Sequence, residues 1–360
     1  MKLVGISVVL AAALLLCLNC APILATPTSA LGTGAAAAPS LITVSTFDDQ
    51  AGTDGKCSLR EAISAANLDA PVDACPSGMG DDMIILQEGR YVLQLAGAGE
   101  DNNAAGDLDL RSNMTIVGAG STLTIIDGGG IDRVLDIHAG AHAVVSGVTI
   151  TSGATPNGKD DGVAGGGNAD PGGGIRNAGD LWLLGCRVTG NRTGDGGGGG
   201  WSYPHVLGGT GGDGGGIYNR GNLTLQSSEV AQNETGNGGW SGLATPCVIF
   251  NQGGHGGGIW NDGTLLSTNS TITANRAAPS TSGDGGGVWN SGTLTITHAT
   301  ISANLAGDYR YYRPDAGGSG GGISNTGRLS LSHTTMSGNR AGDGGGSGRY
   351  SLCWRRPMPI

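Results

Sequence analysis

The sequence predicts an all-β protein, a single-stranded right-handed parallel β-helix with a short N-terminal capping helix. Three observations support this fold: 72 of the 360 residues are glycine, a 20-residue unit recurs five times, and apolar residues alternate with polar ones inside each unit. Glycine, serine, threonine and asparagine are typical of turn-rich β-structure. The 13 prolines follow no Gly-X-Y period, which excludes collagen. The right-handed sense follows from the crossover preference of parallel strands.

The chain is acidic overall. Its 19 basic and 29 acidic residues give a net charge of −10, which disfavours binding to the phosphate backbone of nucleic acids. Charged residues make up only 13 % of the chain, against a usual ~25 %, so the composition is not that of a charged disordered chain. We therefore expect a folded protein without a nucleic-acid partner.

The first 30 residues have the layout of a secretory signal peptide. Lys2 precedes an apolar run from Leu3 to Leu18, and small residues follow it. Residues 31–40 are rich in alanine and glycine and are expected to form a linker. No later segment has the ~18 uninterrupted apolar residues of a transmembrane helix. The chain is therefore expected to be secreted or displayed at the cell surface.

Export determines how the seven cysteines are interpreted. Cys17 and Cys20 leave with the signal peptide, unless one of them is lipidated. Cys57 and Cys75 lie in one N-terminal unit and are the natural disulfide pair in an oxidising compartment; the alternative is two unrelated small core residues. An odd number of remaining cysteines requires a free thiol or an intermolecular bridge. The three whose state the sequence leaves open are Cys186, Cys247 and Cys353.

A short helix is expected from Ser58 to Asn67. Ser58 is a good N-cap, and Glu61 stands three residues later as its capping-box partner. This helix is expected to cover the N-terminal end of the solenoid, where apolar columns and unpaired strands would otherwise be exposed. We assign residues 41–130 to this cap and the first coils.

Residues 131–346 contain the repeats. Each unit has 20 residues and no internal gap, whereas the links between units vary in length, so all loops are expected to leave the coil at one corner. A degenerate earlier copy runs from Ile137 to Gly153, with Ile137 at the offset of Ile175. The five regular units are Gly172–Asn191, Gly214–Asn233, Gly256–Asn275, Gly285–Asn304 and Gly320–Asn339.

Each unit alternates apolar and polar residues with period two, as strands with one buried face do. Ile217, Leu223, Leu225 and Val230 are the expected inward residues of one unit. Coils stacked at ~4.8 Å would place equivalent aliphatic residues on one another. A single coil cannot bury its apolar face alone, so stacking is what stabilises the fold.

The fixed spacing within the 20-residue unit also predicts two columns of asparagine at the turns. Their carboxamides are expected to hydrogen-bond along the axis, as in the Asn ladders of cross-β structures; the functional alternative is a row of ligand-binding amides. The first column is Asn177, Asn219, Asn261, Asn290 and Asn325. The second is Asn191, Asn233, Asn275, Asn304 and Asn339.

Two motifs resemble those of a known family. The string CSLREAISAAN, Cys57 to Asn67, resembles the opening signature of CSLREA-domain-containing exported bacterial proteins, and the segments Asp81–Leu86 and Asn113–Gly118 fit the same pattern. The GGGI-x-N units resemble the parallel β-helix repeats of polymorphic outer-membrane proteins and autotransporter passengers. The resemblance spans about residues 41–346. It implies a secreted or surface-displayed protein with an adhesin-like or unassigned role and no shared catalytic residues.

The C-terminal residues 347–360 depart from that pattern. They have neither an alternating strand pattern nor a barrel-forming anchor domain. We expect either that the array has lost its normal end, by truncation or a frame shift, or that this tail is an improvised cap.

The function that the sequence favours is binding. The position after the first aliphatic residue of a unit points outward, and on three successive coils it holds Tyr218, Trp260 and Trp289. Such rings can stack on a carbohydrate or anchor another surface protein. The alternative is that they stack on one another and shield the sheet. Because Arg276–Asp284 is the shortest insert, Trp260 and Trp289 are expected to be exposed.

Catalysis is the second function class considered, and no catalytic residue is assigned. A β-helix polysaccharide lyase or hydrolase needs convergent acids, and its site would use the inserts Gly194–Asp213 or Thr235–His255. The outward positions of the third strand are mostly threonine and serine, except for Arg187 and Glu229, which a cross-strand ion pair explains. That hydroxyl-rich face leaves an ice-binding or purely structural surface protein as the third possibility.

No cofactor is expected and no metal ligand is assigned. The alternative is calcium bound in the Gly/Asp-rich corners, whose sequence more simply indicates turns. The corner aspartates are Asp195, Asp213, Asp284 and Asp343. A metal pair formed by His298 and His333, which share an offset on adjacent coils, is the other alternative.

Overall fold

The structure is a computed structural model that describes residues 40–161, 165–200, 207–241, 249–308 and 317–343. The expected signal peptide, all but the last residue of the expected linker and the atypical C-terminal tail lie outside the described residues. So do Cys247 and Cys353. None of the described helices is long and apolar enough to cross a membrane.

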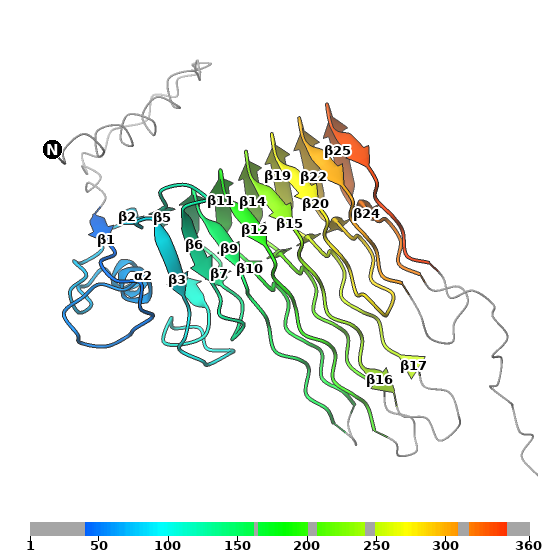
Figure 1. Ribbon diagram of the computed structural model, residues 1–360, viewed down its shortest axis with the longest axis horizontal. Helices are drawn as coiled ribbons and strands as arrows, with labels where there is room; N and C mark the ends of the chain where they lie inside the picture. Colours follow the sequence, from blue (N-terminus) through cyan, green and yellow to red (C-terminus); the bar gives the residue numbers. More distant parts are fainter. Residues whose placement is uncertain (1–39, 162–164, 201–206, 242–248, 309–316, 344–360) are drawn as a thin grey trace, which may run out of the picture. The chain divides into compact units, whose positions relative to one another are not determined.

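The architecture is a parallel β-helix, as the sequence predicts (Figure 1). A complete coil contributes one strand to each of three sheets, and every pairing within those three sheets is parallel. Successive strands of one sheet are therefore a full coil apart in the chain, and the sheets grow along the solenoid axis.

The seven-stranded sheet holds the first strand of each coil, the nine-stranded sheet the second and the eight-stranded sheet the third. The seven-stranded sheet consists of β4 (Leu108–Leu110), β7 (Leu135–Ile137), β10 (Ile175–Asn177), β13 (Ile217–Asn219), β18 (Ile259–Asn261), β21 (Val288–Asn290) and β24 (Ile323–Asn325). The nine-stranded sheet consists of β1 (Leu41–Thr43), β2 (Asp82–Ile85), β5 (Met114–Val117), β8 (His142–Ser146), β11 (Asp180–Leu184), β14 (Asn222–Gln226), β19 (Thr264–Thr268), β22 (Thr293–Thr297) and β25 (Arg328–Ser332). The eight-stranded sheet consists of β3 (Gly89–Val92), β6 (Thr124–Asp127), β9 (Thr149–Thr151), β12 (Arg187–Thr189), β15 (Glu229–Ala231), β20 (Thr271–Thr273), β23 (Thr300–Ser302) and β26 (Thr335–Ser337).

The core consists of aliphatic columns that run along the axis. Ile217 pairs in register with Ile175 on one side and with Ile259 on the other, and all three are fully buried. Leu223 and Leu225 are likewise buried, whereas Thr224 between them faces outward. The alternation read from the sequence therefore places the inward side chains of these coils correctly.

The degenerate coil is aligned differently from the prediction. Ile175 pairs with Leu135, and Ile137 pairs with Asn177, so the expected match of Ile137 with Ile175 is wrong by two residues. The turn between β7 and β8 is two residues longer than the turn between β10 and β11. The register is restored in the next strand, where Leu183 pairs with Val145.

Both asparagine columns form continuous hydrogen-bonded ladders inside the turns. In the first, the Nδ2 of Asn177 donates to Oδ1 of Asn219 at 2.7 Å, and each of the next three links measures 2.6 Å. In the second, from Asn191 to Asn339, the links measure 2.9–3.0 Å. Nδ2 in the second ladder also donates to a backbone carbonyl of the preceding coil, as Asn233 does to Val188 at 3.0 Å. These side-chain amides hydrogen-bond to buried backbone groups of the turns, which supports a structural role for the two asparagine columns.

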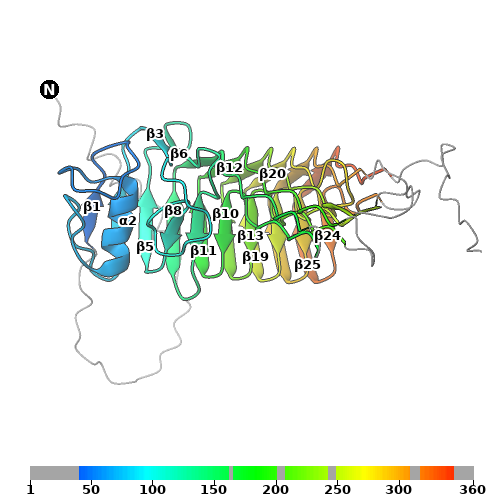
Figure 2. The same cartoon turned by 90° about the horizontal axis from the view of Figure 1, so that it is seen from below.

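The expected helix is α2 (Leu59–Leu68), and the capping box of Ser58 and Glu61 is present in both directions. The helix lies at the N-terminal end of the coils (Figure 2), in contact with β4 and β2. Arg60 donates to the carbonyls of Gly106 and Asp107 at 2.8 and 3.0 Å. Asn67 donates to the carbonyl of Asp109 at 2.7 Å. Side chains of α2 thus satisfy backbone groups at the edge strand β4, which agrees with its predicted capping role.

The long inserts leave the coil between its third strand and the first strand of the next coil. One of them carries the short antiparallel pair β16 (Trp240–Ser241) and β17 (Ile249–Phe250). Neighbouring inserts pack backbone to backbone: the amide of Gly239 donates to the carbonyl of Gly209 at 2.8 Å. A Cβ at Gly209 would stand 1.8 Å from the carbonyl oxygen of Gly167. This contact explains why the inserts are so rich in glycine.

Candidate functional site

One outward-facing column runs along the whole seven-stranded sheet, and we call it the outer column. Each member follows an inward aliphatic residue of its strand, so the alternation of the strand turns it away from the core. Parallel pairing keeps the register from coil to coil. The outer column consists of Asp109, Asp136, Arg176, Tyr218, Trp260, Trp289 and Ser324. An acidic part, a cationic residue and an aromatic part therefore follow one another along one line.

The aromatic part of the outer column is a stack of three rings. The centroids of Tyr218 and Trp260 are 4.3 Å apart with 14° between the ring planes. Those of Trp260 and Trp289 are 5.1 Å apart with 10° between the planes. Rings that are nearly parallel and about one strand spacing apart stack face to face, so their edges point outward.

The expectation that Trp260 is exposed is wrong. Trp260 is only 8 % exposed, because Tyr218 covers one face of its indole and Trp289 covers the other. Tyr218 and Trp289 are half-buried. The short insert after this coil does not expose Trp260, since the covering groups are its neighbours in the column. The stacking that the sequence left as an alternative is the observed arrangement.

The two ends of the stack are different. At Tyr218, the guanidinium of Arg220 lies 5.6 Å from the ring centroid, and the neighbouring member of the column is Arg176. At Trp289, the imidazole of His255 lies 5.8 Å away and roughly parallel, and the next member of the column is Ser324. Cationic side chains therefore flank one end, whereas a small hydroxyl residue follows the other.

The acidic part of the outer column belongs to a cluster that sequence reasoning missed. Ligand-type atoms of Asp101, Asp109, Asp136 and His138 all lie within 4.8 Å of one another. His138 Nε2 is 2.8 Å from Asp109 Oδ1, and Nε of Arg176 donates to Asp136 at 2.9 Å. The available signal was the repeated Leu-Asp-aliphatic pattern of β4 and β7. It was overlooked because these coils lack the GGG unit.

The electrostatics of this cluster follow from burial. Asp109 is fully buried and Asp136 is 3 % exposed on its side chain. Burial raises the pKa of Asp109, against the opposing hydrogen bond from His138. Burial also raises the pKa of nearby Asp107 to about 8, although the guanidinium of Arg133 at 2.8 Å acts in the opposite direction. Three carboxylates and an imidazole are a donor set that suits a divalent cation, but Arg176 already supplies positive charge at Asp136.

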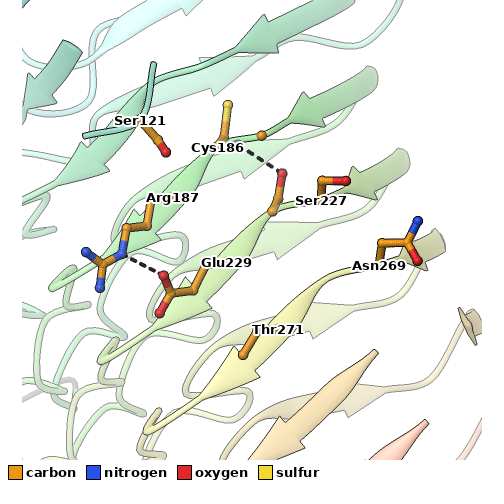
Figure 3. A pocket seen from close by; sticks show the side chains of 9 residues that line it. Ser121, Cys186, Arg187, Ser227, Glu229, Asn269 and Thr271 are labelled. Atoms are coloured by element: carbon orange, nitrogen blue, oxygen red, sulfur yellow. Dashed lines mark hydrogen bonds and ion pairs between the residues drawn. The ribbon is translucent and has the colours of Figure 1, made fainter. Parts of the chain in front are cut away.

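A separate groove lies on the corner between the nine-stranded and the eight-stranded sheets (Figure 3). It has a volume of about 420 Å³, and its lining is mostly polar. Arg187 and Glu229 form the expected cross-strand ion pair on its wall, with Nε and Oε2 2.7 Å apart. Ser227 and Asn269 line it from turns in the left-handed backbone region, with φ of 51° for both.

The thiol of Cys186, which lines this groove, is kept unreactive by its burial. Cys186 is buried, and burial raises its pKa to about 11, so the thiol stays protonated at neutral pH. Its backbone N–H donates to Oγ of Ser228 at 3.1 Å. The groove therefore offers an ion pair, hydroxyls and an amide to a ligand, but no nucleophile at Cys186.

The remaining predicted site residues lie apart from the outer column. Cys57 and Cys75 are joined in a disulfide beside α2, with their Cα atoms 4.8 Å apart. Three of the corner aspartates, Asp195, Asp213 and Asp284, accept hydrogen bonds from backbone amides of the next coil, as Asp213 does from His255 at 2.7 Å. The imidazoles of His298 and His333 stack with centroids 4.7 Å apart and 6° between their planes.

The chain was compared with family models, curated proteins and solved structures. No family model, no curated protein and no solved structure matches it.

Proposed function

We propose that the protein is an exported surface or extracellular interaction protein, adhesin-like in role, that binds a carbohydrate or another surface protein. The signal-peptide layout of residues 1–30 and the resemblance to CSLREA-domain proteins support export. The net charge of −10 disfavours nucleic acid as the partner.

The observation that carries the proposal is the aromatic stack on the outer column. The core of these coils is already filled by aliphatic columns such as Ile217 and Ile259. Tyr218, Trp260 and Trp289 therefore stand on the outside of a rigid sheet, where the core does not require them. Tyrosine and tryptophan held in fixed geometry are the residues that most often anchor ligands and protein partners.

A binding screen with a matched control tests this proposal. The purified secreted protein is applied to a glycan array and to candidate surface proteins, together with Trp289→Ala and Trp182→Ala. Trp182 is the matched control, because it is 40 % exposed on the outer face of the nine-stranded sheet. We expect Trp289→Ala to lose binding and Trp182→Ala to retain it. Equal binding by both variants would contradict the assignment of the outer column.

A second candidate function is that of a polysaccharide-active hydrolase or lyase. The observation that favours it is that Asp109 and Asp136 adjoin the aromatic stack along one column. A carboxyl with a raised pKa, such as Asp109, is suited to donate a proton to a leaving group. Both acids are nearly inaccessible, however, and they bind His138 and Arg176, which is why binding is preferred.

The enzyme candidate has its own test. Release of reducing ends or unsaturated products is measured on a panel of neutral and acidic polysaccharides. Activity that is lost in both Asp109→Asn and Asp136→Asn, with the melting temperature retained, would establish catalysis. Identical product levels in wild type and variants would refute it.

A further inference from the structure

The ring planes of the aromatic stack lie across the solenoid axis. Trp260 and Trp289 are in register on adjacent strands, and their centroids are 5.1 Å apart with nearly parallel planes. Strands in a sheet are spaced ~4.8 Å apart, so the rings stack along the direction in which the coils stack. One face of the Trp289 indole therefore rests on Trp260, and its other face is turned toward the next coil.

The next coil places a small residue at that position. Ser324 of β24 is the register partner of Trp289, and a serine side chain is too short to cover an indole. Trp289 is accordingly more exposed than Trp260, which has a ring on each side. His255, which belongs to the same coil as Trp260, lies with its ring centroid 5.8 Å from that of Trp289. Within the described part of the chain, the stack ends on an indole face above Ser324.

The opposite end of the stack does not offer such a face. Arg220 lies over the ring of Tyr218, and Arg176 occupies the next position while it binds Asp136. Among the described residues, the end of the stack at Trp289 is therefore the one that a ligand ring would extend.

The surroundings of this face are polar. His255 stacks near Trp289, and its Nδ1 accepts a hydrogen bond from the amide of Asp284 at 2.9 Å. Oδ1 of Asp284 accepts one from the amide of Ser319 at 2.6 Å, and Ser319 is exposed. The carboxylate of Asp284 and the hydroxyls of Ser319 and Ser324 are hydrogen-bonding groups of the kind that bind sugar hydroxyls.

We propose that the open face of Trp289 above Ser324 is a subsite for a neutral pyranose with equatorial hydroxyls, such as a unit of a β-linked glucan. This inference rests on the proposed function and names its ligand class. The axial C–H groups of such a sugar form an apolar face that packs on an indole, while its equatorial hydroxyls reach the polar rim. Asp284 and the net charge of −10 disfavour an acidic sugar at this place.

The test fills the subsite without removing the tryptophan. Ser324→Trp places a further ring on the open face, and Ser330→Trp makes the same change on the nine-stranded sheet of the same coil, where the side chain is exposed. Cellotetraose is titrated into the purified full chain, and binding is followed by tryptophan fluorescence and calorimetry. Melting temperatures are measured for each variant.

We expect millimolar binding by the wild type and by Ser330→Trp, and no binding by Ser324→Trp or Trp289→Ala. Ser324→Trp is expected to melt at or above the temperature of the wild type, because the new ring extends the stack. A lower melting temperature would show that the face is already filled, and cellotetraose binding by Ser324→Trp would show that the sugar sits elsewhere. Either result overturns the inference.

The experiments distinguish a failure of the sugar subsite from a failure of the proposed interaction function. No cellotetraose binding by the wild type, combined with a protein partner that requires Trp289, overturns the sugar subsite but supports the interaction function. If the screen finds no glycan or protein partner, or only partners that Trp289→Ala binds as well as the wild type does, both the subsite and the proposed function are overturned.

Discussion

The side-chain amide of Asn219 donates a hydrogen bond to Oδ1 of Asn261 at 2.6 Å, and both side chains are fully buried. Asn261 in turn donates to Asn290 at the same distance. A polar ladder inside an otherwise aliphatic solenoid is stable only while every member is satisfied. Each asparagine therefore supports the coil on either side of it as well as its own turn.

Asn261→Ala is expected to destabilise the protein by about 2 kcal/mol, because it removes the shortest hydrogen bond of the buried Asn219 amide and the side-chain donor to buried Oδ1 of Asn290. Thr264→Ala, an exposed change on the following strand, is the control. Guanidinium denaturation followed by circular dichroism measures the difference. Equal stability of the two variants would show that the ladder is dispensable.

Leu225→Asp tests the inward assignment. Leu225 is fully buried in an aliphatic column between Leu183 and Ser267, so an unpaired charge there is expected to cost more than about 3 kcal/mol. Thr224→Asp changes the adjacent outward position and should be tolerated. The measurements are far-UV circular dichroism and resistance to protease. An unchanged Leu225→Asp protein would mean that the column is not packed as described.

The disulfide should be detectable in the mature protein. Non-reducing peptide mapping is expected to recover Cys57 and Cys75 in one crosslinked peptide pair, whereas Cys186 stays reduced and resists alkylation until the protein is unfolded. Cys75→Ser should lower the free energy of unfolding by about 3 kcal/mol on the chain-entropy model. Recovery of both thiols in the free state from protein purified under oxidising conditions would contradict this prediction.

Stability near the N-terminal coils should depend on pH through Asp107. Burial raises the pKa of Asp107 from 3.8 to about 8 in the folded chain. Between these two values the folded state binds a proton that the unfolded state has released, so the free energy of unfolding falls as pH rises through this interval. Asp107→Asn should flatten that decline. Melting temperatures across the interval check it, and parallel profiles for the two proteins would show that another group is responsible.

Most of the fold could be predicted from the regular repeats, since a fixed 20-residue unit determines both the strand alternation and the register. The register of the first repeat was not readable in the same way. Two extra residues lengthen the turn after Ile137, and His138 lies in that turn. The same feature brings His138 to Asp109, so the cluster around these residues was missed together with the register.

The burial of Trp260 could not be predicted from its strand alone. Alternation correctly turned the residue outward, but exposure also depends on what stands at the same offset in the coils on either side. Large flat rings on both neighbours cover both faces of an indole, whereas serine or threonine would not. The sequence contained this information in the offsets of Tyr218 and Trp289, and the insert length was the wrong criterion.

The rings of the stack should therefore differ in their contribution to stability. Trp260 is covered on both faces and 8 % exposed, so Trp260→Ala is expected to cost about 3 kcal/mol, as for a tryptophan removed from a core. Trp289 is half-buried and has only a serine as its register partner in the next coil, so Trp289→Ala should cost about 1 kcal/mol, the scale of a single aromatic contact. Trp182→Ala on the other sheet provides the baseline for an exposed tryptophan. Guanidinium denaturation at one protein concentration gives the three values. Equal losses for Trp260→Ala and Trp289→Ala would mean that both faces of Trp289 are already covered, and the stack would then be a structural element with no place for a ligand ring.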